Sequence, residues 1–120
     1  MRRMIKDDAQ AAYENLALEL RRGVLVLAVL SQLRNEQYGY SLKQRLDEHG
    51  LEINEGTLYP LLRRLESQGL LKSDWRMEEG GRPRRYYELS PTGVALLEQL
   101  SRDWYELGNV IGKLLEGDES

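Results

Sequence analysis

The sequence predicts a mainly α-helical fold with one small β-hairpin, and three observations lead to this prediction. Apolar residues recur at intervals of three and four in several stretches, which is the period of an amphipathic helix. A turn rich in glycine and proline, residues 78–83, separates two short segments in which apolar residues alternate with polar ones. The chain has 120 residues, 41% of them hydrophobic, which suits one domain with a modest core.

The composition excludes several classes of function. Because the chain has no cysteine, it has no disulfide framework, thiolate metal site or cysteine nucleophile. Its single histidine, His49, stands at a predicted helix end beside Gly50, with no residue of nucleophile type next to it. No phosphate loop, metal-ligand spacing or catalytic triad occurs in the sequence. We therefore expect a protein that is not an enzyme and that holds neither a cofactor nor a metal.

No segment has the pattern of an export signal or of a membrane span. Residues 1–6 are basic, but Asp7 and Asp8 follow where the apolar part of a signal would begin. The most apolar run, residues 24–30, is far shorter than the ~20 residues that cross a bilayer. We therefore expect a soluble, cytoplasmic protein with no membrane partner.

The first expected element is a helix over about residues 8–33, a stretch without proline. Its first half spaces apolar residues helically, whereas residues 24–30 are apolar on every side. That run could also form a buried strand, because β-branched residues alternate in it. Val26, Leu30 and Leu33 keep the helical spacing, so we favour a helix. Gly23 could divide the stretch into two helices, and the sequence leaves this open.

Two shorter helices follow a polar break at residues 35–38. The first spans about residues 40–48. The second begins either near Asn54, a good N-cap, or near Thr57, which would place Pro60 where its missing N–H costs little. The apolar face of this second helix has the spacing i, i+3, i+4, i+7, in Leu58, Leu61, Leu62 and Leu65.

Two strands and a long helix complete the expected fold. The strands flank the turn at residues 78–83, with Leu71, Ser73, Trp75 and Met77 on one face of the first, and Tyr87 and Leu89 on one face of the second. Ser90 then supplies an N-cap and Pro91 occupies the first helical position, so the last helix runs over about residues 91–116.

The last helix carries the most regular pattern in the chain. Its apolar residues step by 3, 4, 3, 4 and 3 from Leu97 to Leu114, a heptad seam about 27 Å long. A domain this small cannot easily bury so long a seam, so we favour a homodimer interface over packing within one chain. Part of the first helix offers a second apolar stripe. The expected interface residues are Leu16, Leu20, Leu97, Leu100, Trp104, Leu107, Ile111 and Leu114.

The formal net charge of −3 at first argues against binding to nucleic acid, but the charge is unevenly distributed. Residues 63–87 carry a net +3, and the other 95 residues carry −6. Within the basic segment, Arg63 and Arg64 lie on the outer face of the third helix. Arg82, Arg84 and Arg85 cluster at the tip of the hairpin.

This arrangement is typical of a winged helix-turn-helix. The second and third helices would form the turn motif, the third would enter the major groove, and the hairpin would follow the flanking backbone. Arginine suits both places because its planar fork binds phosphate or a guanine edge. A solvated surface is the alternative for any single arginine, and a winged-helix adaptor that binds protein instead of DNA is the alternative for the whole chain.

Three blocks of the sequence resemble the PadR-like transcriptional regulators. They are residues 38–40, residues 55–71 with Trp75 after them, and residues 81–93, and the resemblance covers about residues 20–116. The chain is similar to the short subfamily, which has a single C-terminal helix. By that comparison, residues 1–19 form an N-terminal helical extension, residues 20–90 the DNA-binding domain and residues 91–116 the dimerisation helix.

The resemblance implies a homodimeric repressor that a small, often aromatic effector releases from DNA, and a two-fold dimer implies an inverted-repeat operator. Trp104 matches an aromatic position that lines a ligand cavity in some short members. Trp104 and Gly108 are therefore the expected effector site, although an aromatic at a heptad position is more often interface core. The residues expected to face DNA are Asn54, Thr57, Tyr59, Arg63, Arg64, Arg82, Arg84 and Arg85.

Overall fold

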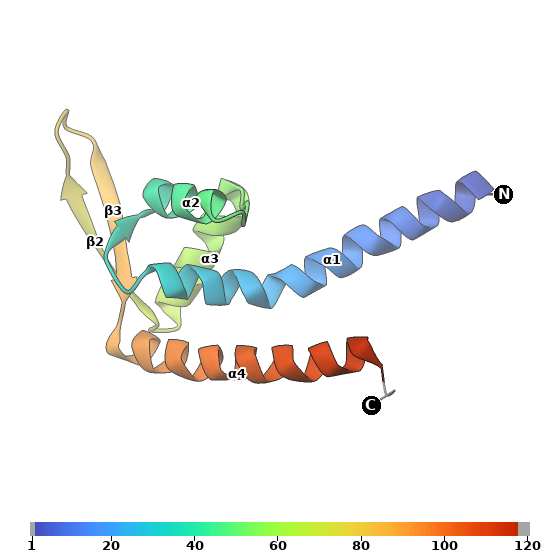
Figure 1. Cartoon of the computed structure of the whole chain (residues 1–120). Coiled ribbons are helices and arrows are strands. Elements are labelled where there is room, and N and C mark those ends of the chain that lie inside the picture. The colour runs from blue at the N-terminus through green and yellow to red at the C-terminus, as the bar shows by residue number, and fades with distance from the viewer. Residues whose placement is uncertain (1, 118–120) are drawn as a thin grey trace.

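The computed structural model describes the backbone of residues 2–117 and the side chains of residues 7–117. Its elements in chain order are α1 (Arg2–Gln32), β1 (Gln37–Tyr38), α2 (Gly39–Glu48), α3 (Glu55–Ser67), β2 (Leu71–Met77), β3 (Pro83–Leu89) and α4 (Pro91–Glu116). Figure 1 shows α2 and α3 stacked beside the β2–β3 hairpin, with α4 beneath α1. The predicted fold class, mainly helical with a small β element in a winged helix-turn-helix, is confirmed.

Helix α1 is continuous over its 31 residues, and Gly23 does not divide it. The helical interpretation of residues 24–30 is confirmed, and Val29 and Leu30 are fully buried. The N-terminal half of α1 projects away from the rest of the molecule on the side opposite to the hairpin (Figure 1). Leu16 and Leu20, on either side of the middle of α1, are exposed. Among the described residues, no helix is long and apolar enough to cross a membrane.

The β element is a three-stranded antiparallel sheet in the order β1-β3-β2, so the expectation of a hairpin alone was incomplete. The missed strand is β1, in the stretch that the sequence indicated as a polar break, where Gln37 pairs with Tyr87 and Tyr38 with Tyr86. Two residues are too few to show an alternating pattern. The strand exists because the exposed edge of β3 is there to pair with it.

We call β2, β3 and the turn between them the wing. Its turn contains Gly80 and Gly81, both with positive φ, and the Gly81 N–H donates to the Glu78 carbonyl at 3.0 Å. Only the base of the wing belongs to the core. Trp75, which the alternating pattern placed on the same face as the buried Leu71, is 62% exposed, because the wing extends beyond the helices that cover its base.

Helix α3 begins after Asn54, whose side chain accepts a hydrogen bond from the Thr57 N–H at 2.9 Å. The alternative start at Thr57 is therefore wrong. Pro60 lies inside the helix on the exposed side, where its missing N–H removes one backbone hydrogen bond. The inner face is buried as predicted, in Leu58, Leu61, Leu62 and Leu65.

Helix α4 begins as predicted: the Ser90 side chain accepts from the Gly93 N–H at 3.0 Å, and Pro91 is the first helical residue. Leu97, expected on the dimer seam, is only 2% exposed and belongs to the core of its own chain. Leu100 also packs against that core. The seam is therefore divided, because the start of α4 covers the domain and the rest extends past it.

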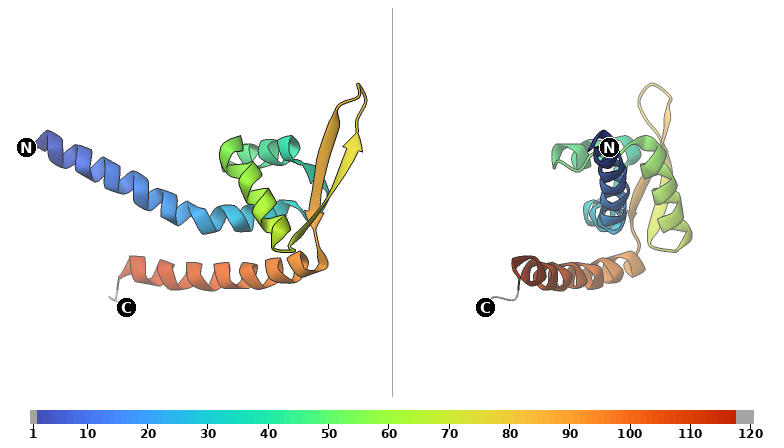
Figure 2. Two further views of the ribbon diagram at one scale, coloured as in Figure 1. Left: turned by 180° about the vertical axis from the view of Figure 1, so that it is seen from behind. Right: turned by 90° about the vertical axis from the view of Figure 1, so that its right-hand side faces the viewer.

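The exposed part of the seam lies toward the C-terminal end of α4. Its four members, all between 46% and 65% exposed, are Trp104, Leu107, Ile111 and Leu114. Figures 1 and 2 show α1 and α4 lying close near the core and separating toward the two termini. The parts of both helices that extend past the core thus present apolar side chains that no other described residue covers.

Candidate nucleic-acid interface

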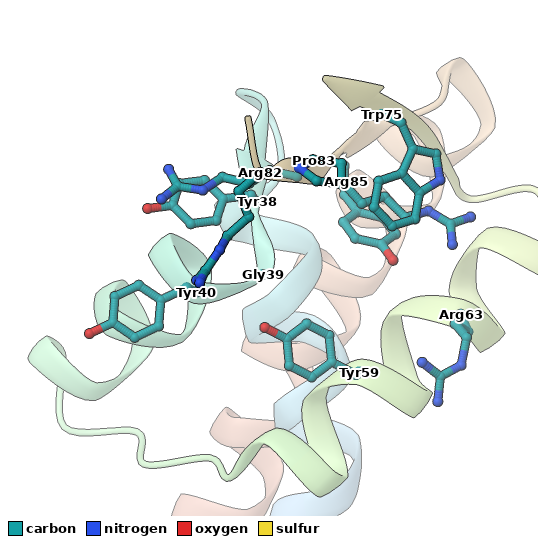
Figure 3. Close-up of a pocket in the computed structure, with 11 residues that line it drawn as sticks. Tyr38, Gly39, Tyr40, Tyr59, Arg63, Trp75, Arg82, Pro83 and Arg85 are labelled. Carbon is teal, nitrogen blue, oxygen red and sulfur yellow. The ribbon is translucent and has the colours of Figure 1, made fainter. Parts of the chain in front are cut away.

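A cleft of about 620 Å³ lies between the wing, the start of α2 and the middle of α3 (Figure 3). We call it the wing cleft. Five aromatic and four arginine side chains line it, together with Gly39 and Pro83, and none of the eleven lining residues is acidic. The aromatic residues are Tyr38, Tyr40, Tyr59, Trp75 and Tyr87, and the arginines are Arg63, Arg82, Arg84 and Arg85. Guanidinium and hydroxyl donors without carboxylates suit a polyanion such as a phosphate backbone.

Helix α3 contributes Tyr59 and Arg63, which lie one turn apart below Trp75 and Arg85 of the wing (Figure 3). Tyr59 is half-buried with its ring against Gly39, and Arg63 is exposed. Burial, with a smaller contribution from the charge of Glu55, raises the pKa of Tyr59 above its ordinary 10.0. The Tyr59 hydroxyl is therefore protonated near neutral pH and can donate a hydrogen bond to a phosphate oxygen.

The other expected contacts on α3 lie outside the wing cleft. Thr57 and Arg64 are exposed on the outer part of the helix. Asn54 is exposed, but its side-chain oxygen is occupied in capping α3. The structure therefore brings Tyr59 and Arg63 together with the wing, and it leaves Asn54 with a structural role that the sequence also indicated.

The three wing arginines differ in their surroundings. Arg82 is exposed at the turn, and Arg84 stacks over the ring of Tyr38 at 4.5 Å from the centroid. Arg85 instead forms an ion pair with Glu66 of α3 at 2.7 Å. Arg84 and Arg85 lie within β3 and not at the tip, and neighbouring residues of a strand point to opposite faces.

Two further basic residues of this segment are paired with carboxylates on the face of the wing that Arg84 shares, opposite to Trp75 and Arg85. Arg76 is hydrogen-bonded to both carboxylate oxygens of Glu36 and paired with Asp74, and these carboxylates raise the pKa of Arg76. Lys72 lies 3.8 Å from Glu88. Within residues 7–117, no carboxylate forms an ion pair with Arg63, Arg64, Arg82 or Arg84. The positive charge available to an anion is thus concentrated at the wing cleft and along α3.

Polar contacts hold the turn between α2 and α3. Asp47 accepts from Lys43 at 2.8 Å and from the Ile53 N–H at 3.4 Å, and the hydrogen bond from Lys43 lowers the pKa of Asp47. From α1, Arg21 donates to the Glu52 carbonyl at 2.7 Å. These bonds connect α1 and α2 to the residues just before α3, and so place the N-terminus of that helix.

Sequence reasoning assigned no DNA role to the buried Tyr87, nor to three more accessible aromatic residues of the wing cleft, Tyr38, Tyr40 and Trp75. All three belong to blocks that resemble the PadR-like regulators, so their positions were noted without a function. The places of Tyr38 and Tyr40 beside the arginines depend on β1 pairing with β3, which no local pattern reveals. Trp75 lies beside Arg85 because β2 pairs with β3. Trp104 and Gly108, the expected effector residues, lie on the exposed part of α4, and a β-carbon at Gly108 would meet nothing within 4 Å.

Comparison with known proteins identifies the family of this chain. Residues 26–99 match the model of the transcriptional regulator PadR-like family. A curated transcriptional regulator of Mycobacterium tuberculosis is 40% identical over 94 residues, which cover 78% of this chain and 87% of that protein.

Solved structures of PadR proteins have the same fold. A PadR family transcriptional regulator from Eggerthella lenta is 48% identical with a TM-score of 0.82, and the match covers 96% of this chain and 99% of that one. A PadR-like transcription factor from Bacteroides fragilis is 35% identical with a TM-score of 0.72, over 83% and 98% of the two chains. Because these relatives are transcriptional regulators, the prediction that the chain is not an enzyme is confirmed. The chain belongs to the PadR-like family of transcriptional regulators, which act by binding DNA.

Proposed function

We propose that this chain is a homodimeric, cytoplasmic repressor that binds an inverted-repeat operator and that a small aromatic effector releases. Helix α3 enters the major groove with Thr57, Arg63 and Arg64 on its outer side. The phosphate backbone beside that groove runs through the wing cleft. The observation that carries this proposal is the wing cleft itself, where Arg63 of α3 converges with Arg82 and Arg84 of the wing. None of these three forms an ion pair with a carboxylate among the described residues.

Exposed apolar side chains support the homodimer. The outer half of α4 presents Trp104, Leu107, Ile111 and Leu114, and the middle of α1 presents Leu16 and Leu20. A second copy related by a two-fold axis would cover both stripes at once. The two α3 helices of the dimer, one from each protomer, are the recognition helices. They would then bind half-sites that lie about one helical turn of DNA, ~34 Å, or a multiple of it apart.

Trp104 is the residue that we propose contacts the effector. Its ring is half exposed on α4, and Gly108 and Gly112 lie one and two turns further along with open space above them. Between two protomers this region could hold a planar aromatic molecule against the indole ring. The test is quenching of tryptophan fluorescence by planar aromatic compounds in a Trp75→Phe variant, where Trp104 is the single reporter. If calorimetry shows that Trp104→Ala binds the same aromatic compounds with the same affinity as the wild type, Trp104 is not part of the effector site.

The DNA assignment is tested by the salt dependence of binding to a duplex selected from a randomised pool. Each phosphate contact contributes a slope of about −0.9 to log K against log salt. We expect Arg63→Gln and Arg84→Gln to weaken binding and to make the slope shallower by about that amount for each phosphate that the variant dimer no longer binds. Arg102→Gln, on the exposed side of α4, is the control and should leave the slope unchanged.

Failure of the selection would favour the other candidate, a winged-helix adaptor that binds protein. If no duplex is enriched over the starting pool, or if the arginine variants bind as the wild type does, the DNA assignment of these residues is wrong.

A further inference from the structure

The indole ring of Trp75 stands on the wing in an unusual setting. Trp75 on β2 pairs directly with Arg85 on β3, and the Arg85 guanidinium lies 5.6 Å from the centroid of its ring. The same guanidinium lies 5.5 Å from the ring of Tyr87, which is buried at the base of the wing. Trp75 is therefore held on one side by a cation while 62% of its surface remains open to solvent.

Arg85 is bound from several directions by its own chain. Its Nη2 donates to Glu66 at 2.7 Å and its Nε donates to the Ser73 hydroxyl at 3.0 Å. The Ser73 hydroxyl in turn donates to the other carboxylate oxygen of Glu66. A phosphate that approached Arg85 would come close to the Glu66 carboxylate, which already neutralises this guanidinium and would repel the anion. Arg84, whose guanidinium has no carboxylate partner among the described residues, meets no such obstacle.

Glu66 belongs to α3, so the ion pair between Arg85 and Glu66 connects the wing to this recognition helix. The hydrogen bonds span 19 residues of sequence and set the position of β3 relative to the end of α3. Because Trp75 rests on Arg85, the same bonds set the position of the indole relative to Arg63 and Tyr59 across the wing cleft (Figure 3).

We propose, resting on the DNA-binding function above, that Trp75 is a further DNA-contacting residue and that Arg85 is a positioning residue that presents it. The indole offers a flat apolar face for a deoxyribose ring and one N–H for a phosphate oxygen, with no acceptor to repel that oxygen. In proteins that bind the minor groove, apolar side chains frequently insert there together with basic ones. Arg85 acts through Trp75 and Glu66 and does not touch a phosphate.

The contact is tested by the accessibility of Trp75 to acrylamide with and without the selected duplex. Trp104→Phe leaves Trp75 as the single tryptophan, and anisotropy of a labelled duplex first establishes that the variant binds. We expect the quenching constant of Trp75 to fall severalfold in the complex. In the matched Trp75→Phe variant, the remaining Trp104 should show the same quenching with and without DNA.

Fluorine NMR of the unsubstituted chain carrying 5-fluorotryptophan gives the same information if Trp104→Phe fails to bind. The Trp75 resonance should shift on addition of the duplex and the Trp104 resonance should not. A Trp75 that stays fully accessible in a formed complex overturns this proposal and leaves the DNA-binding function standing. A wild-type chain that binds no duplex contradicts the DNA-binding function instead.

The role of Arg85 is tested by comparing Arg85→Gln with Arg84→Gln. We expect Arg84→Gln to make the salt slope shallower, whereas Arg85→Gln keeps the wild-type slope, weakens binding about tenfold and abolishes the protection of Trp75. Glu66→Gln should reproduce the Arg85→Gln result, and the double variant should be no weaker than either single one. Lys72→Gln, which removes a cation from the opposite face of the wing, controls for net charge. A slope in Arg85→Gln as shallow as that in Arg84→Gln would identify Arg85 as a phosphate ligand.

Discussion

Gly39 lies against the ring of Tyr59, and there is no room for a side chain between them. A β-carbon at Gly39 would stand 2.8 Å from the hydroxyl oxygen of Tyr59 and 2.9 Å from Cζ. Both are closer than real β-carbons approach a neighbouring atom. The contact joins the first residue of α2 to the middle of α3, and it determines where the Tyr59 hydroxyl stands in the wing cleft.

Gly39→Ala is therefore expected to weaken operator binding more than it weakens the fold. The Tyr59 ring can rotate out of contact, which costs no more than about 1.5 kcal/mol of unfolding free energy. Its hydroxyl then leaves the wing cleft, and we expect affinity to fall about tenfold. Anisotropy titration and urea unfolding measure the two effects.

A double-mutant cycle gives the control for this substitution. In a Tyr59→Ala background, Gly39→Ala should cause no further loss of affinity, because the clashing ring is gone. Gly23→Ala, at a helical glycine with nothing within 4 Å, should raise the unfolding free energy by about 1 kcal/mol. Additive losses in the cycle would show that Gly39 acts on binding by another route.

Gly93→Ala is expected to destabilise the whole domain. Gly93 is buried at the start of α4, and a β-carbon there would collide with the Leu70 carbonyl, which also accepts from the Ser90 N–H at 2.9 Å. Backbone atoms cannot move aside as a side chain can, so we expect a loss of about 1–3 kcal/mol by urea unfolding. Thr92→Ala, an exposed neighbour in the same turn, should change stability by no more than about 0.5 kcal/mol.

Ile111→Arg should convert the proposed dimer to a monomer. Ile111 is half exposed on the apolar stripe of α4, and a buried unpaired arginine would be costly in the interface. Asn109→Arg adds the same charge about 200° away around the helix, at 3.6 residues per turn, and should leave the dimer intact. Sedimentation velocity distinguishes the two variants. A dimeric Ile111→Arg chain would exclude the α4 stripe as the interface.

The ion pair in the turn between α2 and α3 gives a pH dependence. Lys43 lowers the pKa of Asp47 below its ordinary 3.8, so the folded state favours the ionised carboxylate. Its contribution to stability is present above pH 3.8 and disappears as the pH falls through the lowered pKa. At neutral pH, the Tm of the wild-type protein should therefore be higher than that of the Asp47→Asn variant. This difference in Tm should disappear as the pH falls below 3.8.

Glu48→Gln removes a neighbouring carboxylate and controls for the change in net charge. A difference in Tm between wild type and Asp47→Asn that persists unchanged into strong acid would contradict the role given to the Lys43–Asp47 pair.

The helices of this fold could be predicted because their signals are local. Asn54 and Ser90 cap their helices with their own side chains, and Pro91 suits the first helical position in any context. The buried face of α3 follows from the spacing of its leucines alone. The secondary structure of residues 24–30 was ambiguous, because a run that is apolar on every side shows no helical or strand period of its apolar residues. In the folded chain this run is helical.

The candidate site could be predicted only in part. The positive charge of residues 63–87 indicated a basic surface, and Arg63, Arg82 and Arg84 line the wing cleft without carboxylate partners among the described residues. The sequence treated Arg84 and Arg85 alike. Only the structure separates them, because Glu66 reaches Arg85 from another element and neighbouring strand residues point to opposite faces.

By itself, therefore, the sequence determined the helices, their caps, the winged helix-turn-helix order and the basic segment that we propose faces DNA. The tertiary structure alone decided that β1 completes the sheet, that Leu97 belongs to the core and that Trp75 and Arg85 form a unit with Glu66. The physical reason is the range of the interactions. Periodicity and capping act over a few residues, whereas edge pairing, ion pairs and burial depend on which distant segments the fold brings together.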